Sequence, residues 1–315
     1  MRPFLQRFIW PILGVTTLVL VVATLIAGAA LLRKTGVGDF SATPAQAGRK
    51  LDAYTGLGAW VDLWDASAWR VPAGAVRDMA SHGVRTLYIE TATAKTPSGI
   101  PNPPALSEFV TQAHARHMYV VAWYLPSLKG DSVDFERVMQ AVDFRTVDGQ
   151  KFDSVALDIE STAVKSFDVR NRNLAALSRQ VRRRVGGSYP LGGIIPSPVG
   201  LRKKTGFWDV FPYSTIAESY DVVLPMGYYT YHGHTSAQAR ADVAANMRIL
   251  RAQRGCSRIP VHLIGGIAGL SSAAQVGAFA RAARDSGCIG ASIYDWAGTN
   301  DAKWRELARV WATAK

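Results

Sequence analysis

The chain has 315 residues, and its 36 Lys and Arg outnumber its 24 Asp and Glu, leaving a formal net charge of +12. No nucleic-acid recognition motif accompanies this charge, so we expect no nucleic-acid partner. Solvated helix faces, or attraction to anionic lipids or an anionic cell-wall polymer, account for the charge.

The two cysteines, Cys256 and Cys288, have no His at metal or nucleophile spacing, and we expect no metal or cofactor. A disulfide between them and two separate buried thiols both fit the sequence.

An uncharged run of 24 residues, Ile9 to Leu32, lies near the amino terminus. At about 1.5 Å per residue it can cross a bilayer core of about 30 Å, so residues 1–34 are predicted to be a transmembrane signal anchor. Its length favours an uncleaved anchor, although two Ala-x-Ala sequences loosely fit a cleavage site and would make the protein secreted. Two arginines in the short tail favour a cytoplasmic amino end, with the rest of the chain outside the cell membrane.

Residues 35–52 are rich in small residues, which predicts a linker. Residues 53–315 then alternate strand-like apolar runs with amphipathic helical patterns. The expected strands are Gly58–Trp64, Arg85–Glu90, Tyr119–Leu125, Ser154–Glu160, Leu191–Pro196, Val222–Tyr228, Val261–Gly266 and Gly290–Trp296. The expected helices lie near Ala73–His82, Leu106–His117, Val133–Phe144, Val169–Val185, Ser236–Arg254, Ala273–Ser286 and Lys303–Thr313.

Helix boundaries follow from capping residues. Asp168, Thr235 and Ser271 stand where helix N-caps are expected, and glycines 83, 186 and 287 stand where helices end. The connection Val199–Tyr220 is irregular, aromatic and Pro-containing, and we expect a short helix and a loop over the site there.

Eight strand–helix units predict an α/β fold closed into a (β/α)8 TIM barrel. An open doubly wound sheet is the alternative, but it would usually carry a Gly-rich phosphate loop after the first strand. The sequence there reads Trp64-Asp-Ala-Ser-Ala. The barrel is expected to be a monomer.

The fourth expected strand ends in two carboxylates, Asp158 and Glu160, spaced two residues apart. Residues at this spacing in a strand point to the same side, so both acids share one face while Val155, Leu157 and Ile159 form the other. Like charges this close raise the pKa of one group, which suits chemistry that needs one protonated and one ionised carboxyl. A strand end that runs into solvent is the plainer explanation.

Active sites of such barrels lie at the carboxyl ends of the strands, where alternation turns a set of acids and aromatic rings inward. Aromatic rings stack on sugar faces and carboxylates bind hydroxyl groups, so the set suits a carbohydrate. Its members could also serve as core residues, caps or salt-bridge partners. Besides Asp158 and Glu160 the candidates are Trp60, Asp62, Glu90, Trp123 (or Tyr124), Met226, Tyr228 and Trp296, with Trp64, Tyr88 and Tyr294 beside them. His232 and His234 are interpreted as loop residues.

The segment Asp153-Ser-Val-Ala-Leu-Asp158-Ile-Glu160 resembles the fourth-strand signature of the family 18 glycoside hydrolases, the chitinase-like enzymes, Asp-Gly-x-Asp-x-Asp-x-Glu. It differs at Ser154, where Gly is usual, and at Ala156, where Asp is usual. Leu224-Pro-Met226-Gly-Tyr228-Tyr229 is similar to the sixth-strand Met-x-Tyr-Asp, with Tyr229 in place of the Asp. Gly290-Ala-Ser-Ile-Tyr-Asp-Trp296 resembles the last strand, whose Trp floors the sugar pocket.

The resemblance implies that Glu160 is the general acid that protonates the glycosidic oxygen. Asp158 would orient the substrate's acetamido group, and Tyr228 would hydrogen-bond it, in a substrate-assisted mechanism. The implied activity is that of a glycosidase on a polysaccharide containing N-acetylglucosamine, such as chitin or peptidoglycan. Because Ala156 and Tyr229 replace acids, a non-catalytic glycan-binding barrel is the alternative. The family 25 lysozymes, which also end a strand in Asp-x-Glu and carry a first-strand Asp that Asp62 would match, are the second resemblance.

Overall fold

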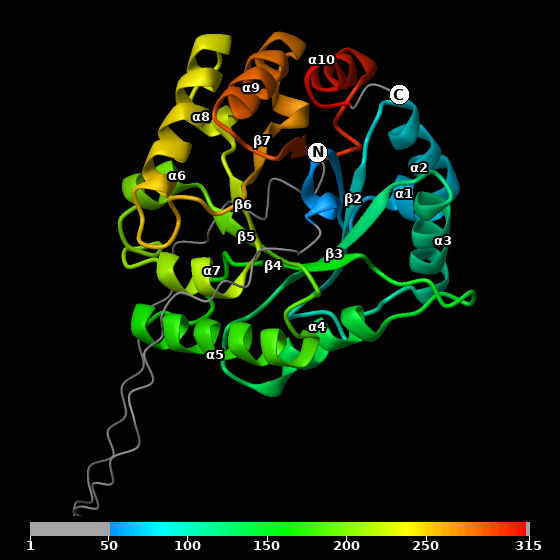
Figure 1. Cartoon of the computed structure of the whole chain (residues 1–315), viewed down its shortest axis with the longest axis vertical. Helices are drawn as coiled ribbons and strands as arrows, with labels where there is room; N and C mark the ends of the chain where they lie inside the picture. The colour runs from blue at the N-terminus through cyan, green and yellow to red at the C-terminus, as the bar shows by residue number, and fades with distance from the viewer. Residues whose placement is uncertain (1–50, 313–315) are drawn as a thin grey trace, which may run out of the picture. The chain divides into compact units, whose positions relative to one another are not determined.

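The computed structural model describes residues 51–312, and these form an eight-stranded parallel barrel surrounded by helices (Figure 1). The strands pair in chain order, and β8 pairs with β1 to close the barrel. They are β1 (Gly56–Val61), β2 (Thr86–Thr93), β3 (Tyr119–Leu125), β4 (Ser154–Asp158), β5 (Leu191–Pro196), β6 (Val222–Met226), β7 (His262–Ile267) and β8 (Gly290–Tyr294). The predicted TIM-barrel fold is confirmed.

The connections carry the helices that cover the barrel. They are α1 (Ala66–Arg70), α2 (Pro72–Ser81), α3 (Pro103–His114), α4 (Ser132–Asp143), α5 (Phe167–Val185), α6 (Pro198–Lys203), α7 (Tyr213–Ser219), α8 (Ser236–Arg251), α9 (Ala273–Asp285) and α10 (Asp301–Trp311). Short 3-10 turns are η2 (Asp52–Tyr54), η3 (Tyr229–Tyr231) and η4 (Ala268–Leu270). Thr235 caps α8 as predicted. The N-caps of α5 and α9 are Ser166 and Ser272, which lie two residues before and one residue after the predicted caps.

Alternation along each strand divides the core into two layers. One set of side chains, such as Leu57, Val155 and Ile293, packs outward against the helices in a continuous hydrophobic cluster. The other set points into the barrel. Tyr124 belongs to the outer set and donates a 2.6 Å hydrogen bond to Asp134 of α4, so Trp123 is the inward residue of β3.

The connection between β5 and β6 differs from the expectation. It holds two short helices, α6 and α7, and the segment between them packs on the outer helix α5. Trp208 donates to Asn171 at 2.7 Å, and Arg170 donates to the carbonyl of Phe207 at 2.9 Å. These contacts hold the segment against the amino-terminal part of α5, and the connection contains two short helices where one was expected.

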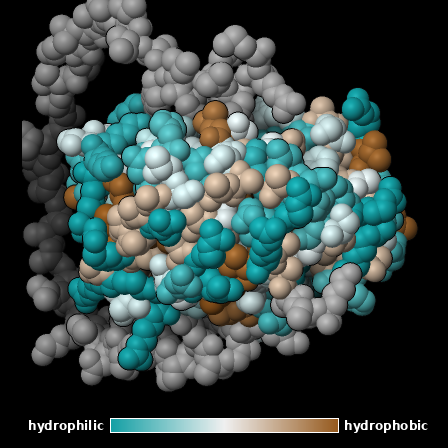
Figure 2. All heavy atoms as spheres, turned by 90° about the horizontal axis from the view of Figure 1, so that it is seen from above, coloured by the Kyte–Doolittle hydropathy of each residue, from teal (hydrophilic) through white to brown (hydrophobic). Residues whose placement is uncertain are grey.

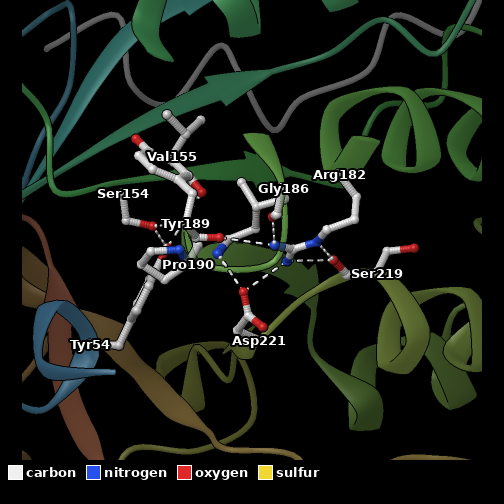
Figure 3. A network of polar contacts seen from close by, with 10 residues as sticks. Tyr54, Ser154, Val155, Arg182, Gly186, Tyr189, Pro190, Ser219 and Asp221 are labelled. Carbon is white, nitrogen blue, oxygen red and sulfur yellow. Dashed lines mark hydrogen bonds and ion pairs between the residues drawn. The ribbon is translucent and has the colours of Figure 1, made fainter. Parts of the chain in front are cut away.

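A buried ion pair ties α5 to the amino ends of β5 and β6 (Figure 3). Arg182 donates to Asp221 at 2.8 Å and to the carbonyls of Ser219 and Tyr189 at 2.9 Å each. The same Asp221 oxygen accepts from the backbone N–H of Leu191 at 2.8 Å. Asp221 is 1% exposed, and its charge is met by the Arg182 guanidinium of α5 and the backbone N–H at the start of β5.

Cys256 and Cys288 are both buried and free, so of the two possibilities the sequence left open, separate thiols are observed. The predicted anchor and most of the predicted linker lie outside the described residues. Within residues 51–312, no helix has the length and apolar character needed to span a bilayer. The face drawn in Figure 2 is mostly hydrophilic, with a few strongly hydrophobic residues scattered over it.

Candidate active site

The floor of the candidate site is a stack of aromatic rings inside the barrel. The Trp60 indole lies on the Tyr88 ring with centroids 4.3 Å apart, and Trp123 meets it edge-on at 6.0 Å. Trp60 donates its indole N–H to Ser292 Oγ at 2.7 Å. The indole nitrogen of Trp123 is buried and has no hydrogen-bond partner among the described residues. Two of the predicted substrate-binding residues thus form a rigid, largely apolar base.

Beneath this stack, a buried histidine connects four segments. His262 Nδ1 lies 2.9 Å from the carbonyl oxygen of Tyr54, to which it must donate, and Nε2 therefore accepts from Ser292 at 3.0 Å. Burial lowers the pKa of His262 from 6.5 to about 4, so the ring is neutral near pH 7. Gly58 and Gly290 make room for the Tyr88 and His262 rings, because a Cβ atom at Gly58 would lie 2.6 Å from Tyr88 and one at Gly290 would lie 2.4 Å from His262. We did not predict His262, although a lone polar residue in an apolar strand was a signal.

The three predicted catalytic residues converge at one side of the mouth. Asp158 is the last residue of β4 and is 7% exposed, and Glu160 follows in the turn and is partly exposed. Tyr228 follows β6 in a left-handed conformation, with φ 42° and ψ 53°. Burial raises the pKa of Tyr228 well above its ordinary value, and the negative charges of Glu160 and Asp158 raise it further. The phenol therefore stays protonated and can donate a hydrogen bond close to both carboxylates.

Asp62 and Glu90 lie at the same mouth, and both hold the loop after β1. Asp62 Oδ1 accepts from the backbone N–H of Trp64 at 2.7 Å, and Oδ2 accepts from the Tyr294 hydroxyl at 2.7 Å. Glu90 Oε2 accepts from the backbone N–H of Leu63 at 3.0 Å. Asp62 therefore stabilises the turn after β1, which was one of its two possible roles in the sequence, and it also positions the Tyr294 hydroxyl.

Trp296 requires a correction. Its indole donates to Asp78 of α2 at 2.7 Å, and the ring packs against the hydrophobic cluster between sheet and helices. Tyr294, two residues earlier, holds the inward position instead and lies 6.4 Å from the Tyr228 ring. The expectation that Trp296 floors the sugar pocket is wrong, because β8 ends at Tyr294 and strand alternation stops there.

Met226, at the end of β6, and Tyr229, in the turn η3 that follows it, point in different directions. Met226 is buried at the carboxyl end of β6. Tyr229, which stands where the family has an acid, is turned outward. Its ring lies 5.7 Å from Phe279 of α9, and its hydroxyl donates to Ser271 at 3.0 Å.

Asp295 is a site residue that we did not predict. It follows Tyr294 and accepts from the backbone N–H of Gly298 at 2.9 Å. Burial, helped by the nearby charges of Asp62 and Asp65, raises the pKa of Asp295 to about 6, although the hydrogen bond from Gly298 opposes the rise. Its charge also raises the pKa of Tyr228, which places Asp295 at the mouth.

The mouth is rich in carboxylates, and no group of three or more His, Cys, Asp or Glu within residues 51–312 is arranged to hold a metal ion. His232 instead pairs with Asp242, with Nδ1 2.6 Å from the carboxylate. Acid–base chemistry by carboxyl and phenol groups is what this arrangement can perform.

Comparison with known proteins gives the fold a context. No family model matches the chain, and no curated protein matches it. Among solved structures, a chitinase from Chromobacterium violaceum superposes with a TM-score of 0.59 at 12% identity, covering 82% of this chain and all of that one. The Bacillus cereus spore cortex-lytic enzyme SleL gives 0.59 at 10% identity, covering 83% and 75%. The endo-β-1,4-mannanase of Thermotoga petrophila gives 0.57 at 10%, covering 79% and 69%.

The chain is thus an eight-stranded α/β barrel of the type that these glycoside hydrolases use. Identities near one residue in ten establish the shared fold, and barrels of this kind support many chemistries. The side chains at the mouth, and not the fold, therefore determine which reaction the barrel can perform.

Proposed function

We propose that this protein is a glycosidase that cleaves a polysaccharide containing N-acetylglucosamine. The observation that carries the proposal is the convergence of Asp158, Glu160 and Tyr228 beside the buried aromatic floor. Asp158 ends β4, Glu160 lies in the turn after it and Tyr228 follows β6. The resemblance to family 18 assigns a role to each. The solved structures with this fold include two chitinases and a cortex-lytic enzyme, which supports a glycan substrate.

In the proposed reaction, Glu160 gives its proton to the glycosidic oxygen as the bond to the anomeric carbon breaks. The carbonyl oxygen of the substrate's own acetamido group attacks that carbon and forms an oxazolinium ion. Asp158 orients the acetamido N–H and stabilises the positive charge, while the Tyr228 hydroxyl donates to the acetamido oxygen. Water then opens the ring and returns a proton to Glu160.

The remaining residues position the substrate. Trp60 and Trp123 are buried and form the aromatic base beneath the sugar that carries the acetamido group, and Met226 closes the base beside them. Asp62, Glu90 and Tyr294 keep the loop after β1 in place. We further propose that the predicted anchor in residues 1–34 holds the domain at the outer face of the cell membrane.

One observation favours a second function, a glycan-binding barrel without catalysis. Ala156 points into the barrel next to Trp123, where the family signature has an acid. Its methyl group supplies no charge to tune Asp158. Binding would then persist while turnover is lost.

A single experiment separates the two. Full-length protein is incubated with N-acetylglucosamine oligomers, and release of reducing ends is measured for wild type, Glu160→Gln and Glu136→Gln, the last an exposed glutamate on α4. We expect Glu160→Gln to lower kcat by at least about 100-fold, because general acid catalysis contributes about that much, while Glu136→Gln keeps the wild-type rate. Folded wild-type protein that binds the oligomers without cleaving them would establish the binding function instead.

A further inference from the structure

A cavity of about 390 Å³ lies between α6 and α8, outside the site described above. Its base is apolar and includes the buried residues Val199 and Ile249. Three exposed cationic side chains border it: Arg202 and Lys203 from α6, and Arg248 from α8. A concave surface with an apolar base and a cationic rim suits a ligand that carries negative charge on a carbon skeleton.

The one acid in the cavity wall is already compensated. Asp242 is 8% exposed and lies 2.6 Å from His232 Nδ1, and it accepts a 2.8 Å hydrogen bond from Asn246. The nearby Lys203 also lowers its pKa against the effect of burial. The rim cations therefore dominate the field that a ligand would meet.

The two walls are held in a fixed relation by Asn246 of α8. Its side-chain oxygen accepts from the Ser197 hydroxyl at 2.8 Å and from the backbone N–H of Val199 at 3.0 Å, at the start of α6. The cavity is thus formed before any ligand arrives, which lowers the entropy lost on binding.

The cavity belongs to the catalytic side of the barrel. α6 begins two residues after β5, and His232 follows the turn that carries Tyr228 and Tyr231. Tyr231 is 51% exposed, and burial of the remainder together with the charge of Glu160 raises its pKa. The next residue, His232, lines the cavity. A second hollow of about 340 Å³ shares Arg202 and Ile249 with the first and continues along α6. A long substrate leaving the mouth over Tyr231 would reach the cationic rim.

We propose that this cavity is an outer subsite for an anionic oxygen group, a carboxylate or a phosphate, borne by the glycan several units from the cleaved bond. The proposal rests on the proposed glycosidase function and narrows its substrate to an acidic amino-sugar polymer. Cleavage occurs at Glu160, and Arg202, Lys203 and Arg248 select for charge.

The test compares three oligomers of equal length: neutral N-acetylglucosamine, a strand alternating with carboxylate-bearing N-acetylmuramic acid, and N-acetylglucosamine bearing phosphate. The full-length pocket variant Arg202→Gln/Lys203→Gln/Arg248→Gln is compared with a control that loses the same charge at exposed sites elsewhere, Arg179→Gln/Arg240→Gln/Arg305→Gln. The readout is the ratio of kcat/KM for each acidic oligomer to that for the neutral one. We expect the pocket variant to lose about tenfold in this ratio for one acidic oligomer, which identifies the anion, and the control to keep it.

Equal ratios in the two variants would overturn the subsite and leave the glycosidase proposal intact. If no oligomer is cleaved by any variant, the glycosidase proposal fails, and calorimetric titration of the acidic oligomers then decides the subsite. A dissociation constant about tenfold weaker in the pocket variant alone supports it, and equal affinities in both variants refute it.

Discussion

The buried histidine under the aromatic floor makes the stability of the barrel depend on pH. His262 is neutral in the folded protein, with a pKa of about 4 against 6.5 in an unfolded chain. Between these values the unfolded chain takes up a proton that the folded chain does not bind. The stabilisation is therefore complete above pH 6.5 and is lost as the pH falls towards 4. At about 1.4 kcal/mol per pH unit, the gap corresponds to about 3 kcal/mol.

Replacing His262 by Gln isolates this contribution. The amide can donate to the Tyr54 carbonyl and accept from Ser292 as the imidazole does, and it does not titrate. Other groups contribute equally to both proteins, so we expect the difference in free energy of unfolding between wild type and His262→Gln to change by about 3 kcal/mol between pH 7 and pH 4. Urea denaturation followed by tryptophan fluorescence measures it. The exposed His234→Gln is the control. Parallel pH curves for wild type and His262→Gln would refute the reasoning.

Two further predictions concern buried charge. The pKa of Asp295 is about 6 in the folded protein and 3.8 in an unfolded chain, so the unfolded chain ionises first and the folded protein loses stability as the pH rises from 3.8 through 6. Asp295→Asn should therefore be up to about 3 kcal/mol more stable than wild type at pH 7 and equal to it near pH 3.5. Urea denaturation measures the difference. Asp221→Ala, which leaves Arg182 without its buried partner, should lower the free energy of unfolding by about 3–5 kcal/mol, whereas Asp143→Ala, which removes an Arg184 pair with side chains about half exposed, should lower it by less than about 1 kcal/mol. Similar losses in the free energy of unfolding for Asp221→Ala and Asp143→Ala would contradict the conclusion that the buried Arg182–Asp221 pair contributes more than the exposed one.

Much of the barrel follows from local pattern. Strand alternation has a period of two, so the inward residues of β1, β2 and β4 could be predicted from the sequence, whereas the choice between Trp123 and Tyr124 on β3 was left open. The bounds of β3 and β5 are as predicted. The strand ends were less predictable. Four expected strands ran on to Trp64, Glu160, Tyr228 and Trp296, while pairing stops two or three residues earlier.

Those overruns explain the error at Trp296. Once the chain leaves the extended conformation, parity no longer says where a side chain points, and Trp296 turns towards α2. Contacts between distant segments were also beyond reach. The hydrogen bond from His262 to Tyr54 joins residues 208 apart in sequence, and no local pattern reports such a pairing.

The first described residues close the amino-terminal end of the barrel, opposite the candidate site. Residue 51 leads through η2 into the amino end of β1, and Tyr54 inserts its ring there, sharing a 2.6 Å hydrogen bond with Ser154 at the start of β4. This contact ties the first described residues to the end of the barrel opposite the mouth. A truncation that removed Tyr54 would therefore open the amino-terminal end of the barrel to water and leave Ser154 without this buried partner.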